Sequence, residues 1–227
     1  MGRLKLFAAA ALSLLLATTA AAATSPAERI SDATNVLSDF TKIPEQGIPG
    51  SILSEAYGVA VIPGMAKLGA VIGGRFGKGI LVVRKEDGSW SNPAFISLGG
   101  GSIGWQFGAQ SSDLILVFRS PRSVERIADG TFTLGGDASI AAGPVGRSSM
   151  AATDQRLKAE IFSYSRSRGL FAGIALDGSW LRMDEQANAD YYGVALSPSQ
   201  ILAAGSMATP LGATEFVEML ARTAPRI

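Results

Sequence analysis

The chain has 227 residues, with 20 lysines and arginines against 19 aspartates and glutamates, and it contains neither histidine nor cysteine. Without imidazole and thiol side chains, the usual zinc, copper and haem sites lack ligands, and a serine hydrolase lacks its histidine base. The nearly balanced charge also disfavours nucleic-acid binding as the main role, because that role calls for a strongly basic domain.

Residues 1–23 have the layout of a secretory signal peptide. Arg3 and Lys5 form a positive start, an apolar run follows from Leu6 to Ala17, and the alanines up to Ala23 offer cleavage sites. The apolar run is shorter than the roughly 20 residues that span a bilayer, and the chain has no cysteine for lipoprotein acylation. Cleavage near Ala23 leaves 18 basic against 19 acidic residues, because it removes two basic residues and no acidic one. We therefore predict a periplasmic or secreted protein with a single domain over residues 24–227.

The mature chain begins with a helix signal. Ser25 is a suitable cap, Pro26 suits the first helical position, and Glu28 completes a Ser-x-x-Glu capping box. An apolar stripe then runs from Ile30 to Phe40 at helical spacing. The helix either docks on the core of the domain or binds a membrane. We favour docking, because its polar face is mainly acidic and an interfacial helix prefers lysine and arginine there.

After a short helix, the pattern favours strands rich in glycine. Turn signals at Asp87-Gly88 and Asp177-Gly178 predict hairpins that lead to Trp90 and Trp180. The expected strands are Val59–Ile62, Ile80–Val83, Phe95–Leu98, Ile103–Phe107, Leu114–Phe118, Phe132–Leu134, Ala138–Ala141, Ile161–Arg166 and Leu170–Leu176.

Further helices are expected at Ile52–Ala56, from Pro121 to Ile127, after the Ser197–Gln200 capping box, and from Pro210 onward. These elements predict an α+β domain. Its sheet should be glycine-rich, strongly bent and antiparallel, either barrel-like or sandwiched, and flanked by N- and C-terminal helices.

The glycine motif around Ser102 is a weak signal for chemistry. Gly100–Gly104 fits the G-x-S-x-G nucleophile pattern, and the stretch from Gly99 fits G-x-G-x-x-G. Both motifs require a helix to follow, whereas Trp105-Gln106-Phe107 is typical of a strand. We therefore expect neither a hydrolase nor a dinucleotide site there.

Five segments occur in an order that resembles the SYLF domain, a lipid-binding family whose fungal members are also described as actin-binding. They are Tyr57–Gly64, Gly99–Gly108, Gly143–Arg147, Tyr164–Gly173, and Asn188 with Tyr191–Gly193. The resemblance covers roughly Ile30 to Leu220. It implies binding to phosphoinositides or other anionic lipids.

Two groups of basic residues are candidates for such lipid binding. The first comprises Lys67, Arg75 and Lys78, in a stretch without acidic residues that alternates with glycines and apolar side chains such as Phe76. Each cation near an anionic surface contributes ~1 kcal/mol. The alternative is a solvated hairpin.

The second group comprises Arg147, Arg166 and Arg168. Arg147 follows a Gly-Pro-Val-Gly segment, and the other two share one strand face, with serines on the opposite face. The alternative is ion pairing with Asp137, Asp154 or Glu160.

Other candidates have structural interpretations. Asp137 lies in an apolar strand, where a structural pair with an arginine is favoured over catalysis. The aromatic residues, which either line a lipid or sugar pocket or fill the core, are Trp90, Trp105, Trp180, Tyr191 and Tyr192.

The leading hypothesis is non-enzymatic binding of anionic lipid headgroups at a membrane surface, without cofactor, metal or nucleic acid. The alternative is a structural or protein-interaction module of the cell envelope with no lipid affinity. Actin itself is discounted as a partner, because an exported protein does not meet it in its own cell.

A carboxylate-only enzyme, such as a glycosidase, needs two acids across a cleft. The acidic cluster of Asp184, Glu185 and Asp190 is instead expected to be a solvated turn and helix start.

Overall fold

The computed structural model describes residues 24–42, 47–69, 72–103, 108–144, 158–167, 170–172, 176–203 and 208–225. In chain order, the elements are α2 (Pro26–Thr41), α3 (Gly50–Ser54), β1 (Gly58–Gly69), β2 (Ile72–Val83), β3 (Ala94–Ile103), β4 (Gly108–Phe118), α4 (Pro121–Asp129), β5 (Phe132–Thr133), β6 (Ile140–Ala142), β7 (Ile161–Ser167), β8 (Leu170–Ala172), β9 (Trp180–Met183), α6 (Glu185–Tyr192), α7 (Pro198–Leu202) and α8 (Leu211–Thr223). Among the helices in these ranges, none has the length and apolar character needed to cross a lipid bilayer.

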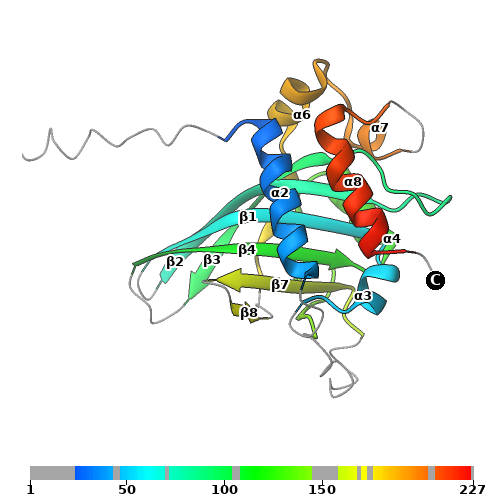
Figure 1. The fold of residues 1–227 in the computed structure, drawn as a ribbon. Coiled ribbons are helices and arrows are strands. Elements are labelled where there is room, and N and C mark those ends of the chain that lie inside the picture. The colour runs from blue at the N-terminus through cyan, green and yellow to red at the C-terminus, as the bar shows by residue number, and fades with distance from the viewer. Residues whose placement is uncertain are drawn as a thin grey trace, which may run out of the picture.

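The described strands form one curled sheet. Its order is β5-β9-β3-β2-β1-β4-β7-β6, and β8 pairs with β7 beside this path. Helices α2 and α8 lie across one face of the long strands (Figure 1). The predicted α+β class, with a bent sheet between terminal helices, is confirmed. The expectation of a purely antiparallel sheet is wrong, because β6 pairs with β7 in parallel.

Two hydrophobic cores lie on opposite faces of this sheet. Strand residues alternate between the faces, so Val59 and Val61 pack against the helical layer while Ala60 and Ile62 face the inside of the curl. We call these the helix face and the inner face. The helix face is covered mainly by α2 and α8, and α4 contributes Val124 and Ile127 to the inner core. Residues on both faces of one strand are therefore buried, which explains the continuous apolar run.

Helix α2 docks on the domain, as predicted. Ser25 and Glu28 form the expected capping box at its start. Ile30, Leu37 and Phe40 are at most 1% exposed and belong to the helix-face core. The helices beginning after Ser120, Ser197 and Pro210 are also confirmed.

Two predictions about the strands are wrong, namely the break after Leu98 and the hairpin through Asp177-Gly178. Strand β3 does not break at the glycines after Leu98 but continues to Ile103. Gly99 leaves space for the Trp180 ring of the neighbouring strand, because a Cβ on Gly99 would lie 2.2 Å from an atom of that ring. The expected hairpin through Asp177-Gly178 does not form. Strand β8 pairs with β7, whereas both edges of β9 are taken by β3 and β5. The predicted stretch 104–107 lies outside the described residues.

A bulge in β1 explains one of the strand glycines. The pairing of β1 shifts register around Pro63 and Gly64, and Gly64 has a φ of 55°. On the paired strand, a Cβ on Gly79 would lie 2.1 Å from the Val61 carbonyl oxygen. The main chains therefore approach each other more closely than any side chain at position 79 permits.

We predict that Gly79→Ala destabilises the fold by about 1–3 kcal/mol or more, because backbone atoms must move to admit the methyl group. Gly101→Ala is the matched control, since a Cβ at that strand position meets nothing within 4 Å and the expected change is within about 0.5 kcal/mol. Urea denaturation of both variants measures the difference. Equal midpoints for the two variants would contradict the steric explanation.

Candidate functional site

The first predicted basic group lies at one end of strands β1 and β2, but on both of their faces. Lys67 and Arg75 are directly opposite each other in the β1–β2 register. They share the inner face of the sheet with Gly77. A Cβ added at Gly77 would lie 3.4 Å from the Met65 side chain of the inner core, which shows the face to which position 77 belongs. Lys78 lies on the helix face. Burial lowers the pKa of Arg75, and the charge of Asp177 opposes this effect.

Exposed apolar side chains gather at the same end. Leu68 is 57% exposed and Phe76 is 49% exposed. Both lie on the helix face, because Leu68 pairs with Gly74 and Phe76 is two residues from Lys78 along the strand. The strands extend past α2 at this end (Figure 1). We call Lys67, Leu68, Arg75, Phe76 and Lys78 the strand-end patch.

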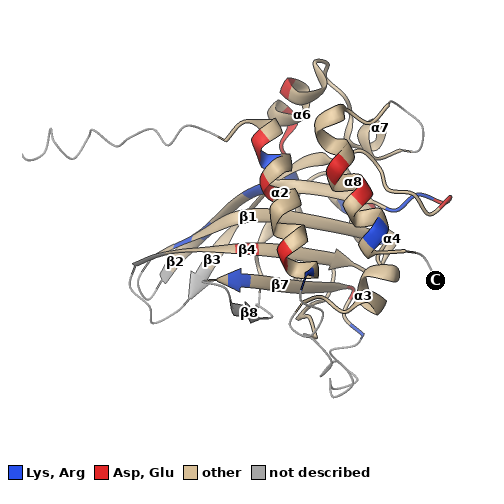
Figure 2. Ribbon diagram, in the orientation of Figure 1, with Lys and Arg blue, Asp and Glu red and all other residues tan. Residues whose placement is uncertain are grey.

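The patch differs in charge from the helices beside it. Figure 2 shows basic positions on the strands where they pass beyond α2, and acidic positions on α2 and α8. The acidic residues of α2 are Glu28, Asp32 and Asp39. The basic positions at the strand ends are therefore separated from the acidic positions of the two helices.

Two residues that the sequence did not single out continue the patch across the sheet. Lys78 pairs with Ser97, and Ser97 pairs with Arg182 of β9. Arg182 is exposed, and its guanidinium carbon lies 4.9 Å from the ring centroid of Trp180. This row belongs to the wall of a cavity of about 550 Å³ that Phe76 also lines. A sequence signal for Arg182 existed only in its two-residue spacing from Trp180.

Lys78 is partly neutralised. Its ammonium lies 3.0 Å from Asp184 Oδ2, and the Arg29 guanidinium contacts the same oxygen at 3.0 Å. The side chains of Arg29, Asp184 and Lys78 are 7%, 11% and 42% exposed. Asp184 also accepts a hydrogen bond from the Ala187 amide and so caps α6. This ionic junction joins α2, β2 and α6.

Asp184 therefore starts a helix, as predicted, but the expectation that it is solvated is wrong. Burial pushes the pKa of Asp184 upward, yet the hydrogen bonds from Lys78 and Arg29 outweigh that effect and hold the pKa below its ordinary value. A carboxylate committed to two cations and a helix cap is a structural group. Within the described ranges, no three acidic side chains come together as a metal site.

Arg166 of the second basic group forms ion pairs, though with partners that were not foreseen. It contacts Asp113 of β4 at 3.1 Å and also Asp39 of α2. Burial lowers the pKa of Arg166, but its bonds to the two carboxylates outweigh this and raise it. Arg147 and Arg168 lie outside the described residues, as does Asp154. Of the second basic group, the described residues therefore include Arg166 alone.

Asp137 pairs with Arg126 at 3.3 Å, which agrees with the predicted structural role. Its carboxylate also accepts a hydrogen bond from the Thr133 amide at 2.7 Å. The side chain is 39% exposed rather than buried, because it closes a turn between short strands. The pair therefore fixes a turn instead of neutralising a charge in the core.

The aromatic candidates separate by burial. Trp90 is 4% exposed, and Tyr191 packs edge-on between Phe95 and Tyr192. These side chains fill space, in agreement with the commoner role weighed from the sequence. Trp180 is half-buried at the strand-end surface, and Trp105 lies outside the described residues.

Comparison with known proteins identifies the family. The family model Ysc84, described as "Las17-binding protein actin regulator", matches residues 99–223. This chain belongs to the Ysc84 (SYLF) family. It is 36% identical over 194 residues to SH3 domain-containing YSC84-like protein 1 of Homo sapiens and of Bos taurus, which is 83% of this chain and 56% of each relative. The resemblance seen in the five sequence segments is thereby confirmed.

A fungal member of the Ysc84 family matches equally well. Protein YSC84 of Saccharomyces cerevisiae is 36% identical over 179 residues, which is 78% of this chain and 38% of the relative. This chain thus spans about half or less of the length of these relatives. The family description and the names of these relatives refer to an actin regulator and to SH3-domain proteins, not to enzymes.

We predict that Asp184→Asn destabilises the fold by about 1–3 kcal/mol, because Arg29 is left buried without its carboxylate. The folded-state pKa of Asp184 is depressed, so its contribution is present above the unfolded pKa of about 3.9 and is lost as pH falls through the folded pKa. The wild type should therefore lose more stability below about pH 4 than the variant does.

Urea denaturation at pH 7 and at pH 3.5 measures both effects. Asp32→Asn, on the exposed face of α2, is the control and should change stability by less than about 0.5 kcal/mol. An Asp184→Asn variant as stable as Asp32→Asn at pH 7 would show that the junction does not stabilise the domain.

Proposed function

We propose that this protein binds membranes containing anionic lipid through the strand-end patch, without enzymatic activity. The observation that supports the proposal most directly is the joint position of Leu68 and Phe76, both about half exposed, beside Lys67, Arg75 and Lys78. Cations of this kind are attracted to lipid phosphates. The exposed apolar side chains at the same strand ends, on the opposite face of the sheet from Lys67 and Arg75, gain by leaving water.

The distribution of side chains over the rest of the surface agrees with this orientation. The other large hydrophobic residues exposed in the described chain are Tyr57, Val194 and Leu211. They do not lie on β1 or β2. Helix α2 turns its apolar stripe inward and two of its three acidic residues, Glu28 and Asp32, outward. The strand ends therefore fit an acidic bilayer better than the helix does.

The headgroup class proposed is a phosphoinositide-like or other acidic phospholipid. A phosphate that reaches the row of Lys78, Ser97 and Arg182 meets two cations, one from each of the strands β2 and β9 that flank β3. Lys78 already shares Asp184 with Arg29, so Arg182 is the less committed of the two cations. Arg147 and Arg168 remain candidates for additional contacts.

We also propose that residues 1–23 are an export signal and that the mature protein is periplasmic or secreted. Cleavage after Ala23 leaves the folded domain complete at its start. Ser25 then still caps α2, and the Thr24 carbonyl still accepts a hydrogen bond from Arg29 at 3.4 Å. Amino-terminal sequencing of the exported protein tests this proposal.

A protein-interaction module without lipid affinity is the second candidate. The family description, which names an actin regulator and a protein partner, favours it. The two functions separate experimentally: the first requires binding to protein-free vesicles, and the second does not.

We predict that the protein co-sediments with phosphatidylserine–phosphatidylcholine vesicles at low salt and releases them as salt is raised, because exposed charges are screened. Replacing Lys67 and Arg75 by glutamine should weaken binding by about fivefold per charge, which corresponds to ~1 kcal/mol each. Arg222→Gln on α8 removes one positive charge elsewhere and is the control for the effect per charge. Binding that ignores the anionic lipid content would contradict the proposal.

We further predict that the double variant Leu68→Ser and Phe76→Ser weakens vesicle binding, because its apolar side chains no longer enter the bilayer. The matched control is Val194→Ser with Leu211→Ser, which removes two exposed apolar side chains elsewhere. Circular dichroism should show that both variants remain folded. An equal loss of binding in the two variants would locate the lipid contact outside the strand-end patch.

A further inference from the structure

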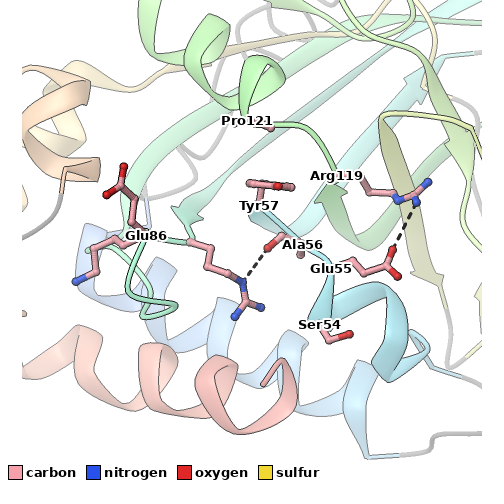
Figure 3. A pocket seen from close by; sticks show the side chains of 9 residues that line it. Ser54, Glu55, Ala56, Tyr57, Glu86, Arg119 and Pro121 are labelled. Carbon is pink, nitrogen blue, oxygen red and sulfur yellow. Dashed lines mark hydrogen bonds and ion pairs between the residues drawn. The ribbon is translucent and has the colours of Figure 1, made fainter. Parts of the chain in front are cut away.

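A second cavity lies at the opposite end of the same strands. Its volume is about 650 Å³, and it is formed where the end of α3, the start of β1, the turn after β2 and the β4–α4 connection meet. Figure 3 shows the side chains that line it. Tyr57 lies eleven residues before Leu68, so the cavity is separated from the strand-end patch by roughly 35 Å of extended chain. The two sites are therefore able to work at the same time.

Arg84 gives the cavity a fixed positive wall. Its guanidinium donates hydrogen bonds to the carbonyls of Ala56 at 2.9 Å, Leu53 at 3.1 Å and Ala224 at 2.8 Å. It also lies 4.3 Å from the ring centroid of Trp90. Carbonyl oxygens at a helix end repel anions, but here the arginine occupies them. The α3 end of the cavity thus carries no net repulsion toward a negatively charged ligand.

Arg119 is the cation best placed to receive such a ligand. Its guanidinium is held against the Phe162 ring at 5.2 Å and donates to the Ala159 carbonyl at 3.4 Å. Its contact with Glu55 is long, at 3.5 Å, and the Glu55 side chain is 62% exposed whereas that of Arg119 is 29% exposed. A good charge-assisted bond measures about 2.7–2.9 Å. The arginine is therefore positioned by the core, while its carboxylate partner is loosely held and replaceable.

Tyr57 provides a rigid apolar contact in the middle. Its ring points into the cavity between Arg119 and the turn that carries Glu86 (Figure 3). The backbone is fixed on both sides, since its amide donates to the Phe118 carbonyl and its carbonyl accepts from the Arg84 amide, each at 2.8 Å. The side chain is nevertheless 45% exposed. Tyrosine and arginine are the residue types that most often dominate binding energy in protein interfaces.

We propose that this cavity is a docking site for an acidic peptide segment of a protein partner. A peptide carboxylate replaces Glu55 on Arg119, and the neighbouring part of the peptide packs on Tyr57. Three cations, Arg84, Lys85 and Arg119, line the cavity against two carboxylates, so the exchange is favoured for an acidic ligand. An extended chain fits better than a compact anion, because Arg119 and the turn that carries Glu86 lie on different sides of the tyrosine ring (Figure 3).

The test uses fluorescein-labelled hexaglutamate as the probe and follows its anisotropy on titration with the full chain at low salt. Glu55→Gln should bind hexaglutamate at least threefold more tightly, because the Glu55 carboxylate no longer competes with the probe for Arg119. Arg119→Gln and Tyr57→Ala should each weaken binding by about tenfold, which corresponds to ~1.4 kcal/mol. Arg122→Gln, on α4 outside the cavity lining, is the charge control and should change binding by less than twofold.

Three results would overturn the proposal. One is a Glu55→Gln variant that binds no more tightly than the wild type; this variant loses only a long, exposed contact and is expected to fold. Another is an equal loss in Arg119→Gln and Arg122→Gln, which would indicate general charge attraction. The third is displacement of the probe by free glutamate at the concentration where hexaglutamate itself displaces it, which would indicate a small carboxylate ligand. The Leu68→Ser and Phe76→Ser variant should retain probe binding, so this site succeeds or fails independently of the lipid proposal.

Discussion

The structure depends on one constraint: the four long strands are buried on both faces over about half of their length. From Val59 to Ile62 in β1 and from Leu114 to Phe118 in β4, every side chain lies in one core or the other. Beyond the bulge at Pro63 and Gly64, the strands continue without a helix to cover them. Their main-chain hydrogen bonds are still satisfied by neighbouring strands, so the extension is stable although its side chains are exposed. The part of the strands that is buried on both faces thus supports an extension whose surface is available for binding.

Many of the basic residues are bound by other groups of the protein. Around the covered half, cations are used inside the protein: Arg29 and Lys78 share Asp184, Arg166 bridges Asp39 and Asp113, and Arg84 occupies backbone carbonyls. Such pairs are costly to break once partly buried, because the remaining charge has no solvent. A basic residue near one of the proposed binding sites can therefore already be bound within the protein, as Lys78 and Arg84 are. A count of basic residues in the sequence does not reveal which of them are bound in this way.

Local signals made the helices predictable, and distant contacts made the ion pairs unpredictable. The capping boxes at Ser25 and Ser197 each lie within four residues, so the sequence contains the whole interaction. Arg166 pairs with Asp113, 53 residues away, and no spacing rule connects them. The glycines after Leu98 were interpreted as a strand break. Whether a glycine interrupts a strand depends on the side chain that faces it, here Trp180, and the sequence does not show which side chain that is. The basic stretch near Lys67 was recognisable from the sequence, but the face on which each residue lies required the bulge, which reverses the alternation.

The hydrogen bonds of Arg84 also bear on how the chain reaches this structure. Arg84 joins the carbonyls of Leu53, from the start of the domain, and Ala224, from the last helix. Helices α2 and α8 likewise pack on each other although most of the sequence separates them. Such remote pairings cost loop-closure entropy before they yield any stabilisation, and they slow folding. The domain therefore completes its tertiary structure only after α8 has been synthesised, and a nascent chain without α8 still lacks part of the helix-face core.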